Sequence, residues 1–121
     1  MTSSDETADA GAARGDNDVF LRGRLAAEPV LRQLPSGDEL CSFRITVARP
    51  ETERGRVDSI DCAATTARVR RSVQAAAPGD VLEVSGCLRR RFWRSAAGLG
   101  SRYEVQVRSV GRVRRRRRSD A

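Results

Sequence analysis

The sequence predicts an all-β domain, a small Greek-key barrel of five strands with one short helix between the third and fourth strands. Apolar and polar residues alternate over five short segments, which is typical of half-buried strands. One further segment has apolar residues at helical spacing, and turn-forming residues separate the segments. At 121 residues the chain is long enough for one compact domain with a buried core.

The first two predicted strands have apolar residues on one face and polar or basic residues on the other. The first covers residues 19–25 and ends before Pro29, because proline cannot donate a hydrogen bond to a strand ladder. Turn-forming residues at positions 35–38 precede the second strand, residues 41–47. The polar faces of these two strands carry Phe20, Arg22, Arg24 and Arg44.

The third predicted strand, residues 57–64, follows a charged loop and precedes the helix. The helix is predicted from the spacing of Val69, Val73, Ala76 and Ala77. Thr65 or Thr66 can cap its N-terminus, and the Pro-Gly pair at 78–79 ends it.

The last two predicted strands form a hairpin. One parity of the fourth strand is apolar at Leu82, Val84 and Leu88. The opposite parity places three side chains together on the outer side, namely Arg89, Arg91 and Trp93. Gly98 and Gly100 are expected in the hairpin loop, and Tyr103 of the fifth strand is expected in the core. Three strands, a helix and two strands is the element order of an OB-fold barrel.

The charge of the chain favours a polyanionic partner. All 23 basic residues are arginine, and 16 acidic residues leave a net charge of +7. Residues 16–113 alone carry 17 arginines against 12 acidic residues, a net charge of +5. A basic domain attracts nucleic acid, although anionic membranes and acidic proteins carry the same sign of charge.

The residue types needed for metal binding or hydrolysis are largely missing. The chain has no histidine, and Cys41, Cys62 and Cys87 are an odd number without C-x-x-C spacing. We expect these cysteines to be small buried residues rather than metal ligands or disulfide partners. No nucleophile motif or close carboxylate pair is present, so we predict no enzymatic activity and no cofactor.

Several motifs together carry a family resemblance. In chain order they read N-D-V-F-L-R-G-R-L-A-A-E-P from residue 17, F-R-I-T-V-A-R from 43, I-D-C from 60, P-G-D from 78, V-S-G-C-L from 84, R-F-W from 91 and Y-E-V from 103. From about Asn17 to Val113 the chain resembles the bacterial single-stranded DNA-binding protein family.

That resemblance implies binding of single-stranded DNA without strong sequence preference, in replication, recombination or repair. It also implies a homo-oligomer, usually a tetramer. Bases would stack on aromatic rings and arginines would contact phosphates, which suits any sequence because every base has a π-face. The predicted contact residues are Trp93, Phe20, Arg22, Arg24, Arg44, Arg89 and Arg91.

The sequence also departs from the family pattern. Thr65 and Ser59 stand where the family can place aromatic residues, so two stacking positions are lost and binding should be weaker and more sensitive to salt. The acidic tip that recruits repair enzymes is replaced by the basic run Arg114–Arg118, which puts such recruitment in doubt.

We expect a polar disordered leader at residues 1–15, one OB-fold domain at 16–113 and a basic disordered tail at 114–121. No apolar run is long enough for a membrane span or a signal sequence. A cytoplasmic, nucleoid-associated protein without membrane contact is therefore expected.

Alternatives stay open at this point. Trp93 could pack the hairpin against the barrel, and Phe20 could lie in a subunit interface. The same fold could bind RNA, because stacking does not read the 2′-hydroxyl. The chain could also be a degenerate paralogue that serves as an assembly or regulatory subunit.

Overall fold

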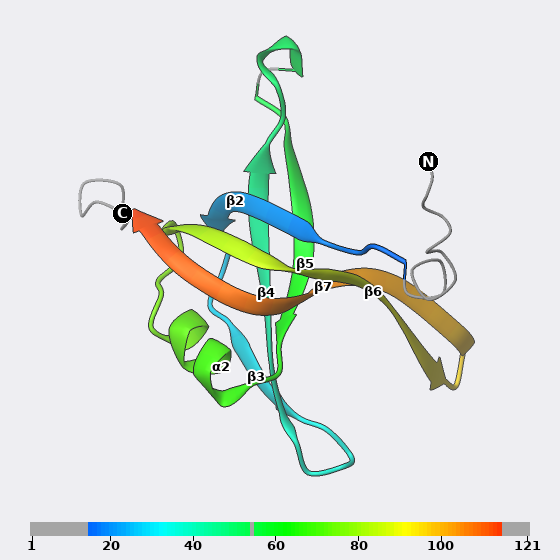
Figure 1. Ribbon diagram of the computed structural model, residues 1–121. Helices are drawn as coiled ribbons and strands as arrows, with labels where there is room; N and C mark the ends of the chain where they lie inside the picture. Colours follow the sequence, from blue (N-terminus) through cyan, green and yellow to red (C-terminus); the bar gives the residue numbers. More distant parts are fainter. Residues whose placement is uncertain (1–14, 54, 115–121) are drawn as a thin grey trace.

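The computed structural model describes residues 15–53 and 55–114 (Figure 1). Its elements are β2 (Val19–Leu25), β3 (Val30–Gln33), β4 (Glu39–Ala48), the 3-10 helix η1 (Glu51–Glu53), β5 (Val57–Ala64), α2 (Ala67–Gln74), β6 (Val81–Ser95) and β7 (Gly98–Arg114). The expected leader and tail lie outside the described residues, except for Gly15 and Arg114 at their inner ends. No helix within the described ranges is long and apolar enough to cross a membrane.

Five strands close into a barrel. β2 pairs with β6, β6 with β7, β7 with β5 and β5 with β4, and a further pairing of β2 with β4 completes the circle. β5 and β7 run parallel, while the other pairs are antiparallel. Helix α2 follows β5 and precedes β6, the third and fourth barrel strands. The predicted OB fold is therefore confirmed.

Alternation along the strands places one set of apolar side chains inside the barrel. The fully buried core includes Leu25, Ile45, Leu82, Val84, Val105 and Val107. Helix α2 adds Val69 and Val73 and contacts β4, β5 and β7. The Thr66 hydroxyl accepts a hydrogen bond from the Val69 amide at 3.3 Å, so Thr66 is the N-cap and satisfies one of the free amides of the first turn.

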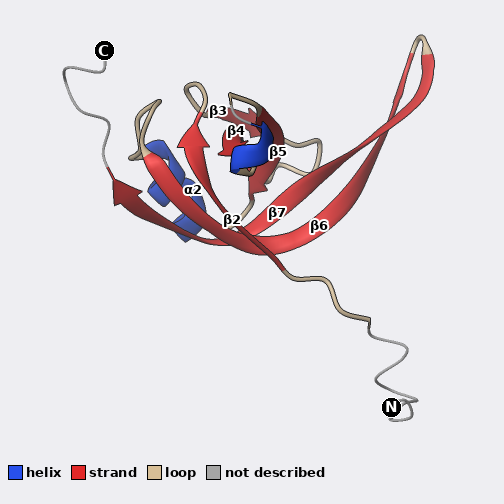
Figure 2. Cartoon of the chain, turned by 90° about the horizontal axis from the view of Figure 1, so that it is seen from above, coloured by secondary structure: helices blue, strands red, loops and turns tan. Residues whose placement is uncertain are grey.

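The hairpin of β6 and β7 extends well beyond the barrel, on the side away from α2 (Figure 2). β6 pairs with β2 only as far as Gly86, and β7 pairs with β5 only from Val105 onward. Residues 89–104 therefore pair only with each other, around a turn at residues 96–97. Except for the buried Glu104, the side chains on both faces of this part of the hairpin are at least partly exposed to solvent.

The strands differ from the expectations at four points. The short strand β3, which pairs with the edge of β4, was not predicted. Gly98 and Gly100 both lie within β7, opposite Ser95 and Trp93, and not in the loop; Gly98, with a φ of 118°, begins the strand directly after the turn. Tyr103 is 57% exposed, because it sits on the projecting hairpin, beyond the barrel core. Leu88, assigned to the apolar face, is also exposed there.

The three cysteines are free thiols, with Cys41 and Cys62 in the core and Cys87 half-buried. No group of three or more histidine, cysteine, aspartate or glutamate side chains in the described residues is placed to hold a metal ion. Burial, together with the nearby charges of Asp61 and Glu104, raises the pKa of the Cys62 thiol to about 12. The fold thus keeps this thiol neutral.

We predict that a thiol reagent at pH 8 leaves Cys62 unmodified in the folded protein and modifies it after unfolding, because the thiolate is the reactive form. The neutral thiol stabilises the fold below the unfolded-state pKa of about 8.5, and this contribution is lost as the pH rises from there toward 12. Mass spectrometry after timed labelling would locate the modified cysteine, and labelling of Cys62 at the rate of a free thiol would contradict the prediction.

Candidate nucleic-acid interface

The outward side chains of β4, β5, β7 and β6 form one continuous outer face. The strand register places Arg44 opposite Asp61, Arg89 opposite Glu104 and Arg91 opposite Arg102. Because side chains alternate, these residues point away from the core positions beside them. The outer face comprises Ser42, Arg44, Asp61, Thr65, Arg89, Arg91, Trp93, Arg102, Glu104 and Gln106.

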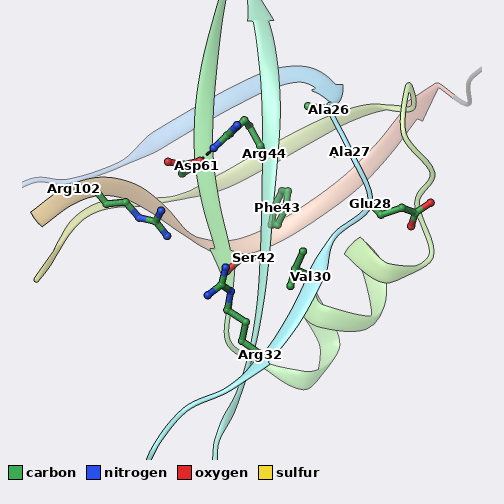
Figure 3. Close-up of a pocket in the computed structure, with 10 residues that line it drawn as sticks. All are labelled: Ala26, Ala27, Glu28, Val30, Arg32, Ser42, Phe43, Arg44, Asp61 and Arg102. Carbon is green, nitrogen blue, oxygen red and sulfur yellow. Dashed lines mark hydrogen bonds and ion pairs between the residues drawn. The ribbon is translucent and has the colours of Figure 1, made fainter. Parts of the chain in front are cut away.

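Two hollows lie on this outer face. One, of about 490 Å³, lies between the β3–β4 hairpin and the projecting β6–β7 hairpin, and Arg89, Arg91 and Thr65 help to line it. The other, of about 230 Å³, is lined in part by Arg44 and Phe43 (Figure 3). The two hollows share the lining residues Arg32, Ser42 and Arg102, so we treat them as one groove. Its arginines are Arg32, Arg44, Arg89, Arg91 and Arg102.

Acidic and amide side chains contact four of these five arginines. Glu104, only 4% exposed, accepts a 2.6 Å hydrogen bond from Arg91 Nε and lies 3.7 Å from Arg102 Nη2. Arg44 Nε bonds to Asp61 Oδ1 at 3.0 Å, and Arg89 Nε to Gln106 Oε1 at 2.8 Å. Each guanidinium has five N–H donors, so those left over can bind an anion in the groove.

Trp93 lies on the same parity of β6 as Arg89 and Arg91, and its indole packs on β7. A Cβ at Gly100, the residue opposite, would lie only 2.4 Å from the indole, so the ring rests directly on the glycine backbone. The side chain is nevertheless 46% exposed. Trp93 therefore packs on the hairpin and also offers ring surface to solvent beside the arginines.

Phe20, Arg22 and Arg24 lie elsewhere on the barrel. They occupy the outer side of β2, next to the outward residues of β6, and line neither hollow of the groove. Arg22 is ion-paired with Glu83, and Arg24 donates a 2.8 Å hydrogen bond to the carbonyl of Gly79. The structure thus gathers Trp93, Arg44, Arg89 and Arg91 on the outer face. The three β2 residues line neither hollow, but β2 lies between β6 and β4, and Arg24 is opposite Thr46 of β4.

Sequence reasoning did not select Arg32, Arg102 or Glu104. Arg102 and Glu104 alternate with Tyr103 and Val105 along the fifth strand. This alternation could have indicated from the sequence that both side chains point outward. Arg32 lies on β3, a strand that was not expected.

We predict that Glu104→Gln strengthens anion binding in the groove. The amide removes a negative charge beside Arg91 and Arg102, so both guanidinium groups can turn to phosphate. Affinity for oligo-dT at low salt should rise several-fold, and the slope of log K against log salt should steepen by about 0.7 for each additional phosphate that the arginines bind. Glu83→Gln, which removes the same charge beside Arg22 outside the groove, is the control. Equal slopes for the two variants would contradict the prediction.

Comparison with known proteins gives a family match and a structural match. The chain matches the single-strand binding protein family model over residues 16–113. A solved structure described as a Plasmodium falciparum SSB complex with ssDNA superposes with a TM-score of 0.65 at 19% sequence identity, over 77% of this chain and 87% of that one. A search of curated proteins found no match. The structural match supports the fold, and the family model covers most of the sequence. The chain therefore belongs to the single-strand binding protein family.

Proposed function

We propose that this chain binds single-stranded DNA without strong sequence preference, with residues 16–113 as the binding unit. The observation that carries the proposal is the outer face, where an exposed indole lies beside a groove lined by five arginines. The family match supports the same ligand, as does the structural neighbour, which is described as a complex with ssDNA.

The expected chemistry follows from the groove. Arginines 44, 89, 91 and 102 contact successive phosphates, while the indole of Trp93 stacks on a base. Thr65 lines the groove without offering a ring, and Ser59 is on the outward parity of β5. Electrostatic contacts therefore supply a larger share of the affinity than stacking does. Phe20, Arg22 and Arg24, on the outer side of β2 next to β4 and β6, contact a strand that extends past the groove to β2.

Fluorescence titration tests this proposal, because Trp93 is the only tryptophan in the chain. Oligo-dT should quench its emission, and raising the salt concentration from about 50 to 200 mM should weaken binding by orders of magnitude if several phosphates are contacted. Binding without quenching would remove Trp93 from the site. A lack of binding at low salt would reject the function itself.

Two finer features of the proposal need separate measurements. Competition between dT and rU oligonucleotides of equal length measures the preference for DNA over RNA, which stacking alone does not provide. Light scattering of the free protein tests the homo-tetramer expected from the family. On the basis of family membership, we also propose a role in replication, recombination or repair. The chain is proposed to act as a binding module without catalysis.

A further inference from the structure

The opposite face of the projecting hairpin carries a second group of aromatic and basic side chains. Arg90, opposite Tyr103, and Phe92, opposite Ser101, alternate with the groove residues and so point to the other side of the sheet. Further along this face Arg94 is opposite Leu99. We call Arg90, Phe92 and Tyr103 the hairpin platform.

The guanidinium of Arg90 is held by both rings of the platform. Its central carbon lies 5.3 Å from the centroid of Phe92 and 5.2 Å from that of Tyr103, within the range of cation–π attraction. Arg90 also donates a 3.0 Å hydrogen bond to the Ser101 hydroxyl and a 3.4 Å bond to the Tyr103 hydroxyl. These contacts fix the three side chains in one arrangement on a two-stranded sheet.

The platform is exposed and positively charged. Phe92 is 71% and Tyr103 57% exposed, although rings of this size are usually buried. The described residues of this face of the hairpin from 88 to 94 and from 99 to 103 include two arginines, Arg90 and Arg94, and no carboxylate. Exposed rings beside uncompensated positive charge are complementary to nucleobases joined by phosphates.

The platform is also continuous with the groove. Phe92 lines the larger hollow together with Arg89 and Arg91 of the outer face, so the platform borders the groove at this residue. A strand that leaves the groove at Phe92 therefore meets the platform next.

We propose that the hairpin platform is a second stacking site for unpaired nucleotides, so that a strand bound in the groove wraps around the projecting hairpin and contacts both of its faces. Bases stack on Phe92 and Tyr103, and Arg90 and Arg94 bind the adjoining phosphates. This inference rests on the proposed function and adds to it a site outside the groove.

Tyrosine fluorescence tests the site directly, because Tyr103 is the only tyrosine in the chain. In a Trp93→Phe variant the tyrosine emission reports Tyr103 alone. A long oligo-dT should quench it, whereas an oligonucleotide too short to leave the groove should not. If wild-type Trp93 is quenched by long oligo-dT and Tyr103 emission in the variant is unchanged at saturation, the platform is refuted while the proposed function stands. If neither residue responds and no binding is detected, the proposed function has failed.

Affinity measurements provide a second, independent test of the platform. Tyr103→Ala should weaken binding of the long oligonucleotide by roughly fivefold or more, since one stacked base is lost. It should leave the short one unaffected, because Tyr103 lines neither hollow of the groove. Tyr103→Phe keeps the ring and should stay near wild-type affinity for both lengths. Because the side chain of Tyr103 is exposed, its truncation should not unfold the barrel. If Tyr103→Ala lowers only the oligomer mass seen by light scattering, the platform contacts a second copy of the chain and the proposal is overturned.

Discussion

Replacing Trp93 with alanine is expected to weaken binding of oligo-dT by roughly tenfold or more, because base stacking on an aromatic ring contributes about 1–3 kcal/mol per base. The outer face offers no other ring at Ser59 or Thr65 that could take over the base, so nothing there compensates for the loss. The exposed position of Trp93 on a hairpin outside the core means that the barrel should remain folded. Anisotropy of labelled oligo-dT measures the loss, and Trp93→Phe should recover much of it.

A pair of glycine variants tests whether the position of the indole matters for binding, without removing the indole. Gly100→Ala places a methyl group 2.4 Å from the ring and must displace Trp93 without removing it. Gly111→Ala makes the same change in the same strand, where nothing lies within 4 Å. We expect Gly100→Ala to lose several-fold in affinity and Gly111→Ala to match wild type. Equal affinities for the two variants would mean that the packing of the indole on β7 does not matter for binding.

Alternation of residue types was enough to predict the barrel strands, because each has one face in the core and one in water. The same principle explains why β3 was missed. All four of its residues, Val30–Gln33, are exposed, so burial imposes no pattern on them. Burial at the projecting end of the hairpin was mispredicted for a related reason. Apolar residues such as Leu88 and Tyr103 keep the core parity there, but the barrel no longer covers them.

Parity also grouped Arg89, Arg91 and Trp93 correctly on one side of β6. Their neighbours on other strands could not be predicted, because these depend on the parallel pairing of β5 with β7 and on a register shift between Ser85 and Gly86. Both are tertiary features that no local pattern encodes. For this reason the sequence could not show that the β2 arginines line neither hollow of the groove, although β2 pairs with β4 in the closed barrel.

Gly86→Ala is expected to produce the largest loss of stability. Gly86 lies inside the barrel at the shift in register, where Ser85 pairs with Ser109 but Gly86 pairs with Val107, leaving Arg108 as the extra residue of a bulge. A Cβ at Gly86 would stand 2.0 Å from the backbone oxygen of Gln106 and 3.0 Å from the Cα of Val107. Relief requires β6 and β7 to separate, because backbone atoms of a sheet cannot rotate away as a side chain can.

Separating these strands also disturbs Val84 and Val107, both fully buried on either side of the bulge. We therefore expect Gly86→Ala to lower the free energy of unfolding by about 3 kcal/mol or more. For a domain of this size that loss corresponds to a fall in Tm on the order of 12 °C or more. Thermal and urea denaturation followed by circular dichroism would measure it, with Gly111→Ala as the matched control that should unfold like wild type. A Tm for Gly86→Ala within a few degrees of wild type would contradict the close contact of β6 and β7 at this bulge.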